Sequence, residues 1–159
     1  LIKEIKDDGN FSIGAAFYPE THFESNDLQD LFHLQRKVKL GADFLISQIF
    51  FDNGSFFDFI EQIRKLDINL PLSAGIMPVT NAAQIKRITQ LCKCEIPKKL
   101  ENILDKYGNN PESMRKAGYF YATEQIIELA AHGINGIHLY AMNKPEVAEA
   151  IMENISFIR

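Results

Sequence analysis

The sequence contains little cysteine, and this limits what the protein can bind. Its two cysteines, Cys92 and Cys94, are separated by one residue. That spacing is neither a zinc knuckle nor a redox-active CxxC pair, and no further group of cysteines and histidines would complete a metal site. We therefore expect two reduced thiols and no metal centre.

Long apolar runs and long basic runs are missing as well. No stretch approaches the roughly 20 apolar residues that cross a membrane, and no signal peptide is visible. The formal net charge is −4, from 17 basic and 21 acidic residues, and the densest basic cluster is the short segment 35–39. We expect a cytoplasmic protein that binds neither membranes nor nucleic acid.

Three common motifs are also absent. The chain has no GxGxxG and no GxxxxGKS/T after any apolar stretch, and it has no GxSxG. The first two absences argue against the usual dinucleotide-binding and P-loop folds, and the third argues against a serine-hydrolase elbow.

Four apolar stretches are present, and they predict β-strands at 11–19, 44–51, 71–78 and 136–142. They are apolar at nearly every position, which predicts strands that are covered on both faces. Helical periodicity separates them, in the segments 26–41, 55–67, 81–93, 96–107, 111–133 and 144–155.

Strands that alternate with helices predict an α/β fold with a parallel sheet, either open and doubly wound or part of a (β/α)8 barrel. Polar residues follow each predicted strand, where barrel enzymes place their sites, and this favours the barrel. A complete barrel needs roughly 250 residues and eight strands. We therefore predict a single partial domain over residues 1–159, half of a TIM barrel. The segment 1–10 reads as the end of a helix, as if the chain began inside a fold.

Polar residues lie at the C-terminal end of each predicted strand: Tyr18, Glu20 and His22, then Gln48 and Asp52, then Asn81 and Gln84, and finally Asn143 and Lys144. Gln48 lies in an apolar run, and a buried amide without a partner costs about 1–3 kcal/mol. It must therefore bond to a core partner or face a lined cavity. His138, inside the last predicted strand, is expected to be a core histidine.

The helix predicted at 26–41 carries a charged face. Asp30, His33 and Lys37 share it, and Arg36 flanks them. A carboxylate can accept hydrogen bonds from ribose hydroxyls, and lysine and arginine can hold phosphates. From the residues alone, a solvated charged face is the usual explanation for such a pattern on a surface helix.

Taken together, four segments resemble the C-terminal half of methylenetetrahydrofolate reductase in order and spacing. They are AAFYPETH, DLFHLQRKVKLGADFLISQIFFDN, GIMPVTNAAQ and GIHLYAMNK. That family is a flavoprotein (β/α)8 barrel that uses NADH or NADPH to reduce FAD. It then passes hydride to 5,10-methylenetetrahydrofolate and gives 5-methyltetrahydrofolate. The resemblance implies an FAD cofactor and a small-molecule folate substrate.

The resemblance also implies roles for individual residues. The positions that match FAD contacts are Tyr18, His22, Asp30, Arg36 and Lys37, together with His33 at a position that is commonly asparagine. The positions that match substrate contacts are Gln48 and Gln84, together with Lys144 at a position that is often arginine.

The family's proton-donating glutamate and its flavin-tuning aspartate belong to the N-terminal half of the barrel. The resemblance therefore implies that this missing half is a partner, and that the chain alone lacks the catalytic acid and is inactive. Two alternatives are another flavin- or phosphate-binding barrel enzyme, and a non-catalytic half barrel that self-associates through its exposed strand edges into a homo-oligomer.

Overall fold

A four-stranded parallel sheet forms the centre of the computed structural model, which describes residues 1–20, 27–92 and 94–158. The strands are β1 (Gly14–Phe17), β2 (Phe44–Ser47), β3 (Leu72–Ile76) and β4 (Gly136–Leu139). All four predicted strands are confirmed, but each is shorter than predicted. The apolar character continues past the strand ends because residues such as Phe50, Phe51 and Met77 are buried in the following loops.

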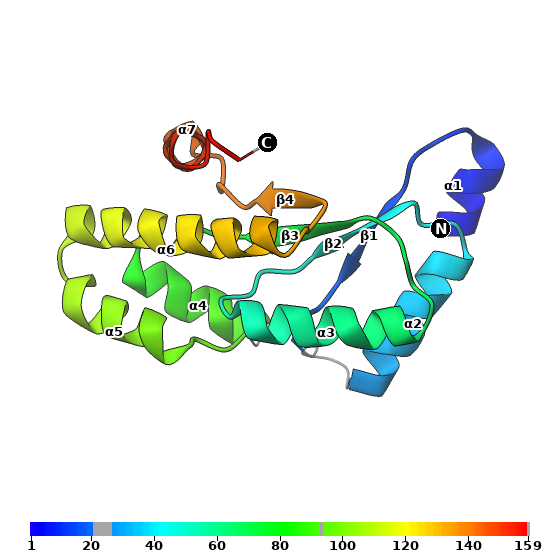
Figure 1. Ribbon diagram of the computed structural model, residues 1–159, viewed down its shortest axis with the longest axis horizontal. Coiled ribbons are helices and arrows are strands. Elements are labelled where there is room, and N and C mark those ends of the chain that lie inside the picture. Colours follow the sequence, from blue (N-terminus) through cyan, green and yellow to red (C-terminus); the bar gives the residue numbers. More distant parts are fainter. Residues whose placement is uncertain (21–26, 93, 159) are drawn as a thin grey trace.

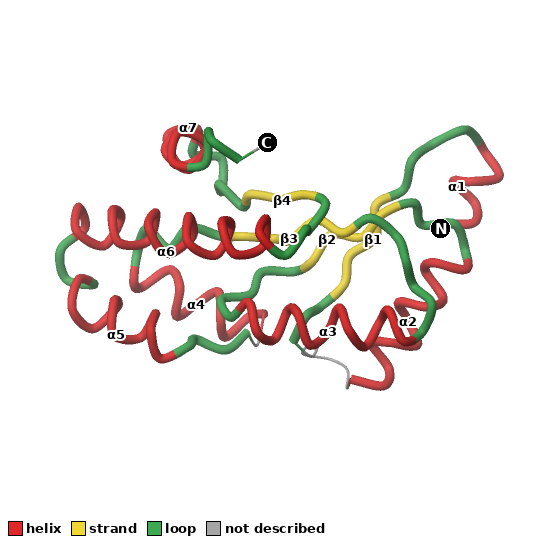
Figure 2. The backbone as a smooth tube through the Cα atoms, in the orientation of Figure 1, coloured by secondary structure: helices red, strands yellow, loops and turns green. Residues whose placement is uncertain are grey.

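Helices alternate with these strands, as predicted (Figure 2). They are α1 (Ile2–Asp8), α2 (Asp27–Lys39), α3 (Asn53–Lys65), α4 (Ala82–Cys92), α5 (Lys98–Tyr107), α6 (Pro111–Ala131) and α7 (Pro145–Asn154). Local sequence sets several of the helix ends. The Asn110 side chain accepts a hydrogen bond from the Ser113 N–H at the start of α6, and Gly133, with φ +76°, follows its end. Helix α3 begins earlier than predicted because the Asp52 side chain caps it.

The strands lie in the order of the sequence, β1-β2-β3-β4, and neighbours are parallel (Figure 1). Each connection therefore leads to the neighbouring strand, always in the same direction across the sheet. Connections of one handedness place their helices on the same face of the sheet. Figure 1 shows α2 to α5 along one side of the strands, with α1 at the β1 end and α7 at the β4 end. A doubly wound sheet reverses its order at a switch point. No reversal occurs among the strands of the described ranges.

The other face of the sheet is open along β1 and at His138 of β4, so the prediction of coverage on both faces is wrong for these strands, whereas the same face of β2 and β3 is half-buried or buried. Along β1 the side chains of Ala15 and Phe17 are buried against the helices, whereas Gly14 and Ala16 are exposed. His138 in β4 is also exposed and meets Tyr140 edge to face, with ring centroids 4.6 Å apart; it is not a core histidine. A sequence pattern counts glycine and alanine as apolar whether they are buried or exposed, as at Gly14 and Ala16.

The core lies between the sheet and the helices, in two groups of buried side chains. The larger group is built on aromatic rings: Phe56 of α3 stacks on Phe50, with centroids 4.5 Å apart, and lies 6.1 Å from Phe17. The second group packs α4, α5 and α6 around the loops that follow β2 and β3. None of the helices in the described parts of the chain is both long and apolar enough to cross a membrane.

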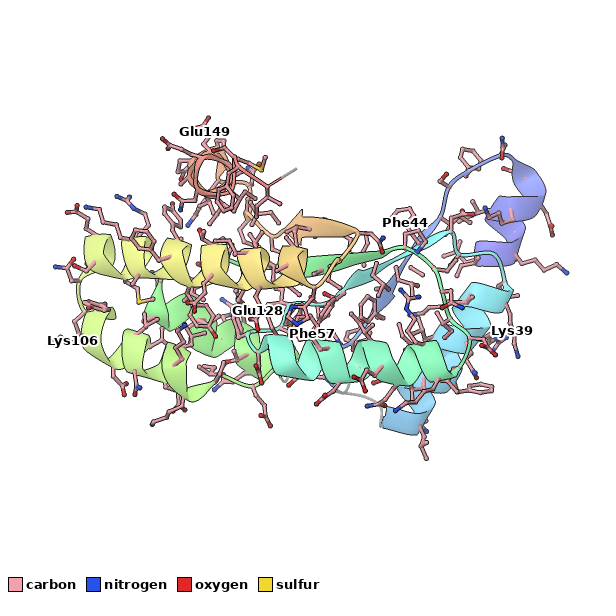
Figure 3. All side chains as sticks on the ribbon, viewed as in Figure 1. Lys39, Phe44, Phe57, Lys106, Glu128 and Glu149 are labelled. Atoms are coloured by element: carbon pink, nitrogen blue, oxygen red, sulfur yellow. The ribbon has the colours of Figure 1, made fainter. Side chains whose placement is uncertain are left out.

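A buried polar contact joins α3 to α6. The Asn53 side chain donates to the Gln125 carbonyl oxygen at 3.1 Å and to the Glu128 carboxylate at 2.7 Å, and it accepts from the Gln125 side chain at 3.2 Å. Figure 3 labels Glu128 where α6 faces α3, close to Phe57. Both amides are more than nine-tenths buried, so each depends on the other to complete its hydrogen bonds.

Replacing Asn53 with alanine is expected to lower the free energy of unfolding by about 1–3 kcal/mol, because it leaves the buried Gln125 amide without its partner. Urea unfolding of the variant measures this loss. The control is Asn69→Ala, since Asn69 is exposed and donates only to the Asp67 carbonyl at 3.4 Å; a change below about 0.5 kcal/mol is expected there. Equal losses in the two variants would show that the α3–α6 contact adds no stability.

Candidate functional site

The carboxyl ends of the four strands lie along one rim of the sheet, and the hollows beside this rim in the described part of the chain include two that contain predicted site residues. The first, the Lys37 hollow, is lined by Ala16, Phe17, Tyr18, Asp30, His33, Leu34, Lys37 and Phe59. It lies between the end of β1 and α2. Four of the predicted cofactor residues therefore share one hollow: Tyr18, Asp30, His33 and Lys37. The spacing of Asp30, His33 and Lys37 on α2 turns them toward the end of β1, beside the buried Leu34.

The Lys37 ammonium is the half-buried cation of this hollow. It donates to the Ala16 carbonyl oxygen at 2.7 Å. Burial lowers the pKa of Lys37, and the negative charge of Asp30 partly opposes that shift. An ammonium has three protons. One of them is used by Ala16, so the group can still donate to an anion while the bond to β1 holds it in place.

The carbonyl that Lys37 contacts faces the free edge of the sheet. Carbonyls alternate in direction along a strand, and Phe17 accepts from the Gln48 N–H of the β2 side at 2.7 Å. Its neighbour Ala16 therefore points away from β2. Because β1 is the first strand in the order, that direction is the sheet edge.

Two of the predicted cofactor residues stand apart from this group. Arg36 is exposed on α2 and does not line the Lys37 hollow. It lies about 100° around the helix from Lys37, because successive residues turn by that angle. His22 lies outside the described residues.

Gln48 was predicted inside a strand, but it follows the last residue of β2. Its side-chain oxygen accepts a hydrogen bond from the Ile49 N–H at 2.9 Å, and the residue is half-buried. The amide oxygen thus finds its partner in the adjacent backbone, which is neither of the two environments expected from the sequence. Gln48 lines neither the Lys37 hollow nor the second hollow.

The second hollow, the Gln84 hollow, lies between the ends of β3 and β4. Its lining is Met77, Pro78, Val79, Thr80, Asn81, Gln84, Ile85, Tyr140, Ala141, Met142, Lys144 and Val147. Gln84 lies in the first turn of α4, which the Asn81 side chain caps by accepting from the Ala83 and Gln84 N–H groups at 2.8 and 3.1 Å. Two predicted substrate residues, Gln84 and Lys144, therefore share this hollow.

The turn that presents Lys144 has an unusual backbone. Met142 and Asn143 have φ values of 53° and 59°, in the left-handed region that side chains disfavour. Such strain is found where the surrounding structure fixes a functional segment. The turn brings Lys144 to the start of α7, directly after β4.

Sequence reasoning missed Tyr140. It lines the Gln84 hollow, and its hydroxyl donates to the Ser47 carbonyl at 3.2 Å. Burial raises the pKa of this phenol. The alternation of side chains along a strand could have indicated it. Tyr140 lies two residues after His138 and therefore lies on the same side of the strand as His138. The described part of the chain holds no set of three histidine, cysteine or acidic residues that could bind a metal ion.

Comparison with known proteins relates this chain to one protein family. Residues 1–156 match the family described as methylenetetrahydrofolate reductase. Methylenetetrahydrofolate reductase (NADH) 1 of Arabidopsis thaliana is 35% identical over 158 residues, which cover 93% of this chain and 27% of the relative. The 5,10-methylenetetrahydrofolate reductase of Escherichia coli strain K12 is 32% identical over 156 residues, covering 98% of this chain and 52% of the relative.

A solved structure has a similar fold. It is an uncharacterized protein from Clostridium thermocellum, which binds two copies of 5-methyl-5,6,7,8-tetrahydrofolic acid. The TM-score is 0.58 at 20% identity, over 98% of this chain and 57% of that one. The chain thus spans about half the length of its bacterial relative and about a quarter of the plant one. From the match over residues 1–156, the chain belongs to the methylenetetrahydrofolate reductase family.

Proposed function

We propose that this chain is the C-terminal half of a (β/α)8 barrel that reduces 5,10-methylenetetrahydrofolate to 5-methyltetrahydrofolate with FAD and NADH or NADPH. In this view residues 1–159 form one partial domain. The Lys37 hollow takes part of the FAD, and the Gln84 hollow takes part of the folate. The observation that carries the proposal is the grouping of Tyr18, Asp30, His33 and Lys37 in one hollow of a chain of this family.

The Lys37 hollow suits the ribose and diphosphate of FAD. Its half-buried ammonium is a donor for phosphate oxygens, and the Asp30 carboxylate is an acceptor for ribose hydroxyls. Tyr18 adds an aromatic surface at the end of β1. Arg36 and His22 complete the set proposed from the resemblance, and Arg36 has the freedom to approach a ligand from the exposed side of α2. Hydride transfer between the nicotinamide and the folate is the chemistry that FAD supplies in this family.

The Gln84 hollow suits a folate. The Gln84 amide can both donate to and accept from a pterin ring, and the Lys144 ammonium can pair with a carboxylate. The Clostridium thermocellum protein supports this reading to a limited extent, since it shares the fold and binds a methylated folate. Gln48, at the neighbouring end of β2, is the third proposed substrate contact.

The open face of the sheet supports the proposal of a half barrel. The solvent-accessible surface is 9711 Å², whereas a compact monomer of 18.1 kDa exposes about 8,100 Å². The excess of about 1,600 Å² is about twice the roughly 800 Å² that each partner buries in a standard protein interface. The partner that we propose is the N-terminal half of the barrel, which would pair with the edges of β1 and β4 and supply the catalytic acid. A second copy of the chain is the alternative, and the mass in solution distinguishes the two.

The test is a titration of the full-length protein with FAD, followed by the change in flavin fluorescence, for wild type and Lys37→Ala. We expect the variant to bind FAD about 10–100-fold more weakly, because it loses a charge-assisted hydrogen bond to the diphosphate. The matched control is Lys39→Ala, which removes the same charge from an exposed position two residues later on α2.

The control should bind FAD within about twofold of wild type, since a solvated charge at that distance is screened. Equal weakening in both variants would mean that only the overall charge of α2 matters, and it would remove the diphosphate from the Lys37 hollow. Absence of FAD binding by the wild-type protein would overturn the proposed function.

A further inference from the structure

Glu20 makes a contact that the proposed function does not use. It follows Pro19 in the turn after β1, two residues beyond Tyr18, and one of its carboxylate oxygens, Oε2, accepts the Glu95 N–H at 2.6 Å. Glu95 lies in the segment between α4 and α5, 75 residues further along the chain. The bond therefore passes over the end of β2, because β2 separates β1 from β3, the strand that leads into α4.

The other carboxylate oxygen of Glu20, Oε1, is buried and has no hydrogen-bond partner in the structure as described. Buried polar atoms of folded proteins nearly always have a partner, so an exception calls for a physical reason. Among the described residues, the groups near the carboxyl include two acidic ones, Asp52 after β2 and Glu95 in the α4–α5 segment, and the buried thiol of Cys94. A neutral carboxyl fits these surroundings better than a charged one.

The ionisation of Glu20 agrees with this geometry. Burial raises the pKa of the carboxyl, and the charges of Glu95 and Asp52 raise it further, while the hydrogen bond from the Glu95 N–H opposes the shift. A neutral carboxyl still accepts that hydrogen bond through one oxygen. The contact to Glu95 therefore does not require a negative charge.

We propose that Glu20 is a positioning residue, which fastens the turn that carries Tyr18 to the segment that follows α4. The proposal rests on the proposed function, because Tyr18 lines the Lys37 hollow and α4 begins with the turn that carries Gln84. By this bond the cofactor side and the folate side of the rim keep a fixed relative position.

The backbone of the turn explains why a side chain is needed. The ladder between β1 and β2 reaches the Phe17 carbonyl, and Pro19 has no N–H to donate. Beyond that point the turn has left the sheet, and its residues must be held by other contacts. The Glu20 side chain provides one, to the segment that follows α4.

Three variants of the full-length protein test this role: Glu20→Ala, Glu20→Gln and Glu95→Gln. Removing the carboxyl in Glu20→Ala should weaken FAD binding by about tenfold, because the Tyr18 turn is no longer fixed. Glu20→Gln should stay within about threefold of wild type, since its amide oxygen accepts the same N–H. Glu95→Gln changes only the side chain of the partner, keeps its N–H, and should leave FAD binding unchanged.

Hydrogen exchange of the Glu95 amide gives a readout that does not depend on the cofactor. Its protection should be lost in Glu20→Ala and kept in Glu20→Gln. A pH series adds a second readout. As the pH rises through the raised pKa of Glu20, ionisation beside Asp52 and Glu95 should weaken FAD binding in wild type, whereas Glu20→Gln should not respond.

The results separate the positioning role from the proposed function. If Lys37→Ala weakens FAD binding but Glu20→Ala does not, the positioning role is wrong and the cofactor site stands. If Glu20→Gln is as impaired as Glu20→Ala, or if the Glu95 amide is equally protected in all variants, the contact does not act as proposed. If Glu95 loses protection in Glu20→Ala but the wild-type protein binds no FAD, the structural contact is real and the proposed function fails.

Discussion

Replacing Phe56 with alanine is expected to lower the free energy of unfolding by about 3–5 kcal/mol. Phe56 is completely buried. Its ring stacks on Phe50 and packs on Phe17, and it joins α3 to the covered face of the sheet. The variant would lose the transfer free energy of a whole ring and leave a cavity between elements that cannot collapse into it, because β1 and β2 hold their spacing through backbone hydrogen bonds.

Urea unfolding of matched preparations measures this effect. The control is Phe120→Ala, which removes the same ring from α6 at a position that is 70% exposed. We expect that substitution to change the free energy of unfolding by less than about 0.5 kcal/mol. A large loss for Phe120 would instead show that its ring is covered in the intact protein, and would make this side of α6 part of an interface.

Replacing Gly118 with alanine is expected to cost about 1–3 kcal/mol, or more, although alanine is the better helix former. Helix α6 lies directly on the loop after β3 at this position. A Cβ on Gly118 would overlap the Val79 carbonyl oxygen and come within 2.6 Å of the Val79 carbonyl carbon. Because the obstacle is backbone, the loop or the helix must move as a whole.

The displaced loop includes Val79, which lines the Gln84 hollow. Under the proposed function, this substitution should therefore also reduce folate affinity. The control is Gly136→Ala in β4, where a Cβ would find its nearest neighbour at 3.5 Å and the backbone angle is compatible with alanine. That variant should unfold within about 0.5 kcal/mol of wild type. If Gly118→Ala is as stable as Gly136→Ala, the α6–loop contact is softer than the structure indicates.

Much of the fold follows from local sequence. The helix periodicity, the Asn110 cap and the stop at Gly133 locate α6 well, because these signals depend on neighbouring residues. The open face of the sheet could not be predicted in the same way. Gly14 and Ala16 are small and apolar, and a pattern of hydropathy does not distinguish a residue packed in a core from one that leaves space for something else.

The candidate site was partly predictable for the same reason. The helical spacing of Asp30, His33 and Lys37 places them on one face, and the structure brings that face to the end of β1. The contact between Glu20 and Glu95 joins residues 75 positions apart, and that between Asn53 and Gln125 joins residues 72 positions apart. Such pairs depend on the packing of whole elements, so no local pattern reveals them.

The hydrogen bond between Lys37 and the Ala16 carbonyl has a consequence for assembly. A strand that extends the sheet at β1 would use this carbonyl as an acceptor, but the ammonium already occupies it. Lysines at sheet edges discourage intermolecular strand pairing and aggregation. A carbonyl oxygen has two lone pairs, so an added strand at β1 would either share this oxygen with the ammonium or displace the ammonium from it. Where the ammonium is displaced, one more of its protons becomes available to an anion.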